Sequence, residues 1–188
     1  MIECNIRDVP RAQAEAEGTS DDEPGPSPAG VVLLYDAWRE MPGAVFAVHQ
    51  AFDATVAFVP ALAGAEIGIA LSSDADVQEL NARFRGQDKP TNVLSFPSAP
   101  GFANDEMPSG DIVIAYETVQ RESVGEDKPF LHHLAHLTVH GLLHLAGYDH
   151  VHDADAETME ALERRILASL NIPDPYRSDV EEHQPVAG

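Results

Sequence analysis

The chain has 188 residues, 44% of them hydrophobic, which is the length and composition of one globular domain. Its single cysteine, Cys4, excludes an internal disulfide and a cysteine-based zinc site. The chain has neither an N-terminal signal pattern nor an uninterrupted apolar run of about 20 residues. We therefore expect a cytoplasmic protein without a membrane span. The formal net charge of −21 disfavours tight non-specific binding of nucleic acid.

Residues 1–30 are predicted to be a disordered extension. They contain few apolar residues, a P-G-P-S-P run and an acidic cluster, so they cannot bury enough surface to offset the entropy lost on ordering. The domain is predicted to occupy residues 31–176. The polar residues 177–188 are predicted to form a flexible tail.

Apolar periodicity predicts strands and helices in alternation over the first part of the domain. Helices are predicted where apolar residues recur every three or four positions, and strands where short apolar runs lie between turn residues. The predicted helices are 42–59 and 73–86, and the predicted strands are 31–35, 65–71, 92–96 and 111–115. Residues 97–108, rich in proline, glycine and polar side chains, are predicted to form a loop.

Two long helices are predicted to follow. Pro129 opens the first, which ends near Gly147, and the second begins at Asp153 or Asp155 and stops before Pro173. The order of elements predicts an α/β (α+β) fold. It would be a single domain with a small mixed sheet, helices packed on that sheet, and a central helix that carries histidines able to bind a metal.

The histidines of that helix form the strongest chemical pattern in the chain. His140 and His144 are four residues apart, so their imidazoles lie on one helix face and can reach one ion. Gly147 allows the chain to turn back and offer His150, for which His152 is the rival. Three histidines with a fourth position left to water form the arrangement of a catalytic zinc site, so we expect one Zn²⁺ per chain.

The spacing of these histidines is that of the metzincin proteases, in which glutamate follows the first histidine and serves as general base. Here that position is Gly141. The metal ligands are therefore present without the residue that peptide hydrolysis needs, and we do not expect a protease.

The run H-G-L-L-H-L-A-G-Y-D-H at residues 140–150 resembles the defining motif of the YbeY endoribonucleases, bacterial factors of ribosomal RNA maturation. Three further segments agree in the same order. They are R-G-Q-D-K-P-T-N-V-L-S-F-P at 85–97, G-D-I-V-I at 110–114 and D-P-Y at 174–176. The resemblance spans about residues 31–176. It implies the same mixed α/β architecture, with the histidine helix at its centre.

Arg85 stands where a helix is expected to stop, and its guanidinium suits phosphate oxygens. From the residues alone, a solvated surface arginine is the more common outcome at such a position. The resemblance implies that it is the family's active-site arginine, so we expect it to be catalytic. Arg83 and Lys89 are candidate RNA contacts.

Three further residues are candidates for contacting the metal-binding histidines without binding the metal themselves. Asp111 and Asp149 could each accept the second N–H of a ligating histidine, although both also fit ordinary turns. His136 lies one turn before His140 and is expected to support that ligand rather than close the site as a fourth one. His132 and His133 are expected at the surface.

The resemblance implies a zinc-dependent, single-strand-type endoribonuclease that matures the 3′ end of small-subunit ribosomal RNA and serves ribosome quality control. The partners it implies are ribosomal RNA and the small subunit, with ribosomal proteins and a ribosome-associated GTPase as further candidates. Two alternatives remain open. One is a non-catalytic ribosome-assembly factor with structural zinc, and the other is a zinc hydrolase of another substrate class.

Overall fold

A computed structural model describes residues 29–98 and 108–177. The predicted extension (1–30) and tail (177–188) therefore lie outside the described residues, except for Ala29, Gly30 and Arg177. The first strand begins at Ala29, whose side chain is buried, so the sheet starts two residues before the expected boundary. No helix of the described ranges is both long and apolar enough to cross a membrane.

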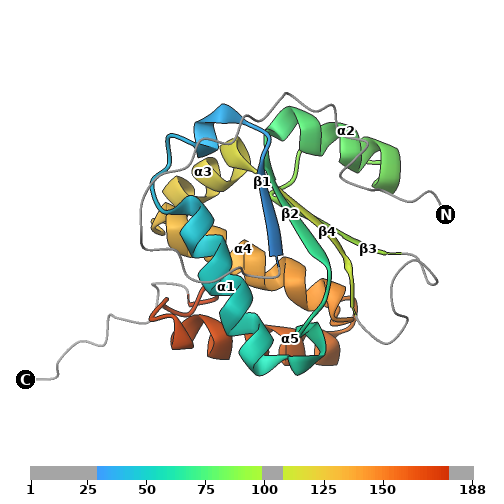
Figure 1. The fold of residues 1–188 in the computed structure, drawn as a ribbon, viewed down its shortest axis with the longest axis vertical. Helices are drawn as coiled ribbons and strands as arrows, with labels where there is room; N and C mark the ends of the chain where they lie inside the picture. The colour runs from blue at the N-terminus through green and yellow to red at the C-terminus, as the bar shows by residue number, and fades with distance from the viewer. Residues whose placement is uncertain (1–28, 99–107, 178–188) are drawn as a thin grey trace, which may run out of the picture.

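Four strands form one mixed sheet in the order β1-β2-β4-β3 (Figure 1). β1, β2 and β4 run parallel to one another, and β3 lies antiparallel to β4 at the edge. The strand bounds are β1 Ala29–Leu33, β2 Ile67–Ser72, β3 Val93–Pro97 and β4 Gly110–Ala115. The four strands are those that the sequence predicts, and the mixed α/β fold is confirmed.

Helices cover both faces of the sheet (Figure 1). Alternate residues of β4 divide between two cores: Ile112 and Ile114 pack with α1, α4 and α5, whereas Val113 and Ala115 pack with α2. The five α-helices of the described residues are α1 Ala44–Phe58, α2 Asp74–Arg85, α3 Tyr116–Gly125, α4 Phe130–Leu145 and α5 Asp153–Ser169. Two short 3-10 helices, Asp36–Trp38 and Pro60–Leu62, flank α1.

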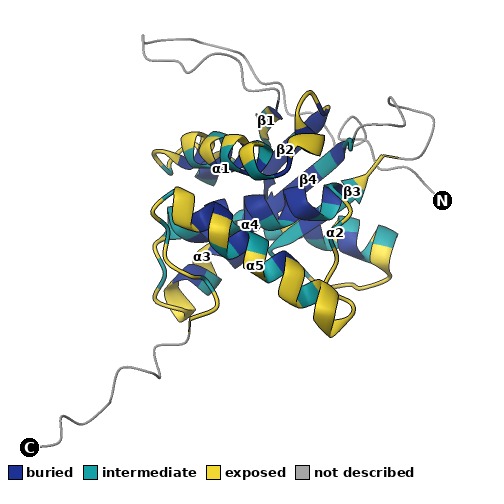
Figure 2. Cartoon of the chain, turned by 90° about the horizontal axis from the view of Figure 1, so that it is seen from below, coloured by how far each residue is buried: buried dark blue, intermediate teal, exposed yellow. Residues whose placement is uncertain are grey.

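α4 is the central helix of the larger core. It lies between α1 and α5, and buried residues run along most of its length (Figure 2). Gly141 allows α4 to approach the sheet closely, because a Cβ there would lie 3.0 Å from Ile112 Cγ2 and 3.1 Å from Ser95 Oγ. The histidine helix is thus held directly against β3 and β4.

The structure adds one helix to the sequence analysis and corrects the position of one histidine. α3 was not predicted, because only one apolar side chain, Val119, is buried on it and its other buried side chains include Thr118 and Ser123. His133 is buried rather than at the surface, and its Nε2 lies 2.8 Å from Glu122 Oε2. Burial raises the pKa of Glu122, but its hydrogen bonds lower it by more, first that with His133, so this carboxylate stays ionised beneath α4.

Candidate metal centre

The end of α4 turns the chain back toward its own histidines. Gly147 adopts a left-handed conformation, with φ of +90°. Its N–H donates to His144 O, and the N–H of Tyr148 donates to Leu143 O, which together make a Schellman C-cap. This turn brings His150 beside the last turn of the helix, as the glycine predicts.

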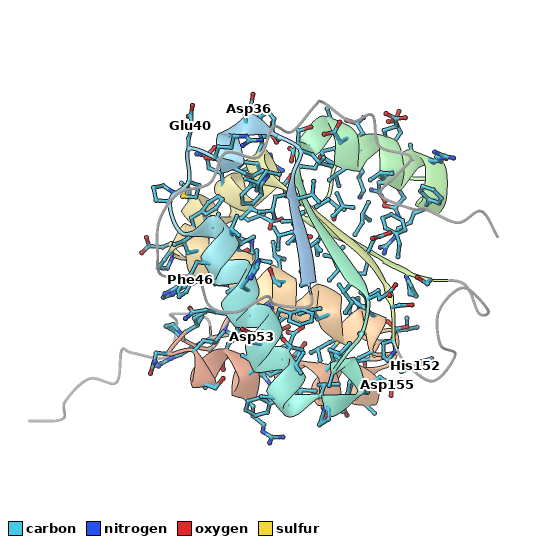
Figure 3. The ribbon with its side chains drawn as sticks, viewed as in Figure 1. Asp36, Glu40, Phe46, Asp53, His152 and Asp155 are labelled. Carbon is cyan, nitrogen blue, oxygen red and sulfur yellow. The ribbon has the colours of Figure 1, made fainter. Side chains whose placement is uncertain are left out.

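Three imidazoles converge there. The ligand atoms of His140, His144 and His150 all lie within 4.8 Å of one another. The ring centroid of His150 is 5.5 Å from that of His140 and 5.0 Å from that of His144. His152 is exposed and precedes α5, and it does not belong to the cluster. Figure 3 shows it with Asp155 at the end of the molecule where α4 gives way to α5.

The two helical histidines face each other through their Nε2 atoms, which are 3.0 Å apart. His144 Nδ1 lies 3.0 Å from Tyr148 O, which can only accept a hydrogen bond, so Nδ1 carries the proton of the neutral ring. His140 Nδ1 lies 2.8 Å from Glu163 Oε1 and is held in the same tautomer. Both Nε2 atoms therefore present lone pairs to the same point.

Two facing lone pairs repel unless a cation lies between them. Two nitrogens bound to one tetrahedral zinc at 2.0–2.1 Å would be about 3.3 Å apart, close to the separation seen here. Burial, followed by the charge of His140, lowers the pKa of His144, so this ring stays neutral and available as a ligand. The donor set therefore fits a metal ion, with an exposed side left for another ligand.

Glu163 is a site residue that the sequence analysis missed. Its side chain is fully buried, with 0% exposed, and accepts from His140, His136 and the Tyr176 hydroxyl. Burial raises the pKa of this carboxyl group, but these three hydrogen bonds lower it by more, to about 2, so the group is ionised. Burial and then Glu163 raise the pKa of Tyr176, so its hydroxyl keeps the proton that it donates. A signal was present: Glu163 lies on the apolar face of α5, between Met159 and Ile166.

The candidates for supporting the ligands lie in three different places. Asp111 is on β4, opposite Phe96, and the carboxylate that contacts His140 is Glu163 instead. Asp149 accepts from the backbone N–H of His150 at 2.7 Å, so it shapes the turn and does not contact a ring nitrogen of that histidine. His136 Nε2 lies 3.3 Å from Glu163 Oε2 and faces this carboxylate.

Arg85 is the last residue of α2, which ends at Gly86 with φ of +68°. The guanidinium is exposed, and α2 packs on the sheet face opposite α4. Phe84 packs on Phe96 of β3, with ring centroids 5.3 Å apart. α2, which ends in Arg85, is thus packed on the edge strand β3 from the face of the sheet opposite the histidine helix.

The basic side chains near Arg85 are open to solvent. Arg83 and Lys89 are exposed, and within the described ranges neither they nor Arg85 form an ion pair. Four other bases of the described residues are each paired with an acid, namely Arg39, Arg121, Lys128 and Arg164. Arg83, Arg85 and Lys89, with Asp88 as the one acid among them, thus form a small cationic cluster in the sequence of a strongly acidic protein.

Comparisons with known proteins identify the family of the chain. The family model described as Endoribonuclease YbeY matches residues 44–171. A Bradyrhizobium protein named Endoribonuclease YbeY is 53% identical over 152 residues, covering 78% of this chain and 90% of its own. A Rhodopseudomonas palustris protein of the same name is 54% identical over 155 residues, covering 78% and 80%. The solution structure of TM1509 from Thermotoga maritima has the same fold, with a TM-score of 0.52 at 24% identity, covering 82% of this chain and 99% of its own. The chain belongs to the endoribonuclease YbeY family.

Proposed function

We propose that this protein is a zinc-dependent endoribonuclease that cleaves single-stranded ribosomal RNA, with the 3′ end of the small-subunit RNA as its target. The observation that carries the proposal is the convergence of the imidazoles of His140, His144 and His150. In the two helical histidines, hydrogen bonds at Nδ1 leave Nε2 available to bind a metal. Family membership supplies the reaction class.

His140, His144 and His150 would hold the metal. Imidazole nitrogen suits zinc, and three histidines with an open position are typical of catalytic rather than structural zinc. When bound there, zinc supplies Lewis-acid chemistry: it polarises a phosphoryl oxygen and makes water more acidic. The exposed ring of His150 leaves one side of the cluster open to a phosphodiester. Glu163 and the carbonyl of Tyr148 keep the two helical imidazoles in the orientation that binding requires.

Arg85 would contact the phosphate backbone together with Arg83 and Lys89. These side chains are exposed and free of acidic partners within the described ranges, so RNA phosphates need not displace a carboxylate. Because α2 and α4 lie on opposite faces of the sheet, an RNA touching both Arg85 and the metal centre would pass around the edge strand β3. We therefore propose that Arg85 holds a phosphate of the RNA where the RNA bends toward the metal centre.

The charge of the protein favours a substrate that is presented to it. A net charge of −21 repels free RNA over most of the surface, and the cationic cluster is small. Ribosomal RNA held on the small subunit, with ribosomal proteins and a ribosome-associated GTPase nearby, would supply the missing affinity. This reasoning supports action in the cytoplasm on an assembled particle, in maturation and in quality control.

The alternatives give different results in one experiment. A ribosome-assembly factor with structural zinc would not need Arg85 or a reactive metal, and a zinc hydrolase of peptides would need a base near His140. Position 141, where the metzincin proteases carry that base, is glycine here and faces the sheet, so that a Cβ would already lie 3.0 Å from Ile112 Cγ2.

The test is single-turnover cleavage of a purified small-subunit precursor particle, with folding checked by circular dichroism. His144→Ala should abolish cleavage, and Arg85→Ala should slow it by about 100-fold, because the RNA would no longer be held in register with the metal centre. The matched controls are His152→Ala, an exposed histidine outside the cluster, and Arg39→Ala, an arginine of the first 3-10 turn. Both controls should cleave at the wild-type rate. Cleavage by folded His144→Ala protein at the wild-type rate would reject the proposal.

A further inference from the structure

The carboxylate of Glu163 joins the metal centre to the C-terminal segment, residues 174–176. Its Oε1 accepts from His140 Nδ1 at 2.8 Å, and its Oε2 accepts from the hydroxyl of Tyr176 and faces His136 Nε2 at 3.3 Å. In the described part of the chain the charged partners of Glu163 are histidines only. A fully buried carboxylate is therefore contacted by three donor groups, and no ion pair with a lysine or arginine is seen for it among the described residues.

The C-terminal segment is attached by contacts that do not involve the Tyr176 hydroxyl. Lys128 Nζ donates to Pro175 O at 2.7 Å, and Arg164 Nε lies 3.4 Å from Asp174 Oδ1. Asp174 Oδ1 also accepts from the backbone N–H of Tyr176 at 2.9 Å, and the guanidinium of Arg164 lies 4.8 Å from the centre of the Tyr176 ring. Removing only the hydroxyl should leave the segment in place.

A buried negative charge without a paired cation is costly, and a metal ion on Nε2 of His140 would supply a positive charge on the far side of that ring. An ionised carboxylate on Nδ1 makes imidazole a stronger ligand at Nε2 and fixes its tautomer. The Tyr176 hydroxyl satisfies the oxygen of Glu163 that His140 does not use and limits rotation of the carboxylate. The segment that follows α5 thereby acts on a ligand that precedes it by more than 30 residues.

We propose that Glu163 and Tyr176 are positioning residues of the metal centre, and that the C-terminal segment strengthens metal binding through the path Tyr176, Glu163, His140. This inference rests on the proposed metal site but is independent of the RNA substrate. Coupling of this kind is reciprocal, so the metal ion must in turn stabilise docking of residues 174–176. The path also gives the D-P-Y motif a chemical role.

The experiment measures Zn²⁺ affinity by competition with a chromogenic chelator at pH 7.5, in Tyr176→Phe, Glu163→Gln and wild type. Glu163→Gln should weaken binding by about 10–100-fold, and Tyr176→Phe by about tenfold, the low end of the range for such supporting contacts. The matched control is Tyr35→Phe, which also removes a hydroxyl bound to a carboxylate, that of Glu117, on the far side of the fold. It should bind Zn²⁺ as wild type does. The visible spectrum of Co²⁺-loaded protein should change in Tyr176→Phe and stay unchanged in Tyr35→Phe.

Reciprocity supplies a second readout that does not depend on cleavage of RNA. Trypsin should cut after Arg177 more slowly in Zn²⁺-loaded than in metal-free wild type, and this difference should shrink in Tyr176→Phe. Wild-type Zn²⁺ affinity and an unchanged Co²⁺ spectrum in Tyr176→Phe would overturn the inference while leaving the proposed function intact. A wild-type protein that binds no Zn²⁺ would overturn both. Because Tyr176→Phe keeps the ring and the other contacts of the segment, the result remains decisive even if Glu163→Gln does not fold.

Discussion

Replacing Gly141 by alanine tests whether the histidine helix is pressed against the sheet as closely as the structure shows. The added Cβ would lie 3.0 Å from Ile112 Cγ2, 3.1 Å from Ile112 Cδ1 and 3.1 Å from Ser95 Oγ. Ile112 is fully buried on β4, which is paired on both sides, by β2 and β3, so it has little freedom to withdraw. The substitution should therefore strain the interface between α4 and the sheet.

Two opposing terms set the magnitude. Alanine in place of glycine within a helix stabilises by about 0.5–1 kcal/mol, because the unfolded chain has less freedom to lose. Overfilling a well-packed core costs about 1–3 kcal/mol. We expect Gly141→Ala to lose about 1 kcal/mol net, which lowers the melting temperature by about 2–4 °C for a chain of this size.

The assay is urea unfolding followed by circular dichroism, performed with excess chelator so that metal binding does not contribute. Gly125→Ala is the matched control, since Gly125 ends α3 and a Cβ there meets nothing within 4 Å. It should be neutral or stabilising by up to about 0.5 kcal/mol. Ile112→Val removes one of the crowded methyl groups, so a double-mutant cycle with Gly141→Ala should show a coupling of at least about 0.5 kcal/mol. Equal or greater stability of Gly141→Ala relative to wild type would refute the tight contact.

Four further outcomes are expected. Chelation of the metal should lower the melting temperature of the wild-type protein, because the ion binds only the folded chain. The melting temperature of His144→Ala should not change on chelation. Differential scanning calorimetry measures both. In metal-free protein the folded-state pKa of Glu163, about 2, lies below its ordinary value of 4.5, so the stability it contributes is complete above pH 4.5 and is lost as pH falls toward 2. Urea unfolding between pH 6 and 3 should therefore be less steeply pH-dependent in Glu163→Gln, and parallel profiles would contradict this. Arg85→Lys should reduce the rate of single-turnover cleavage by about tenfold and leave Zn²⁺ affinity unchanged, because lysine keeps the charge but loses the two-pronged donor geometry. Cleavage at the wild-type rate would show that Arg85 contributes only its charge. A chain starting at Ser27, which keeps Ala29 and all of β1, should melt within about a degree of the full chain, whereas a loss of several degrees would show that the omitted residues pack on the domain.

The sequence by itself determined the elements whose signals are local. The period of apolar residues predicts the four strands and four of the five described helices, because one face of each is buried. The C-terminal end of α4 was predictable from Gly147, since a left-handed residue there closes the helix with bonds to its own last carbonyls. Two histidines four residues apart must share a helix face, so the pair His140 and His144 also followed from the sequence.

Tertiary structure decided the features that depend on how separate elements pack. Glu163 follows His140 by 23 residues and reaches it only because α5 lies against α4, and Tyr176 joins them from the segment beyond α5. From the sequence, Gly141 was notable only because it replaces the general base of the metzincin proteases. The structure shows that glycine at this position lets α4 pack closely against the sheet. Likewise, only the arrangement of the layers shows that α2, which ends in Arg85, and the histidine helix α4 pack on opposite faces of the sheet. Periodicity specifies which face of a helix is buried but not which side chain of another element meets it, because that choice is set by the distances and crossing angles of the packed elements.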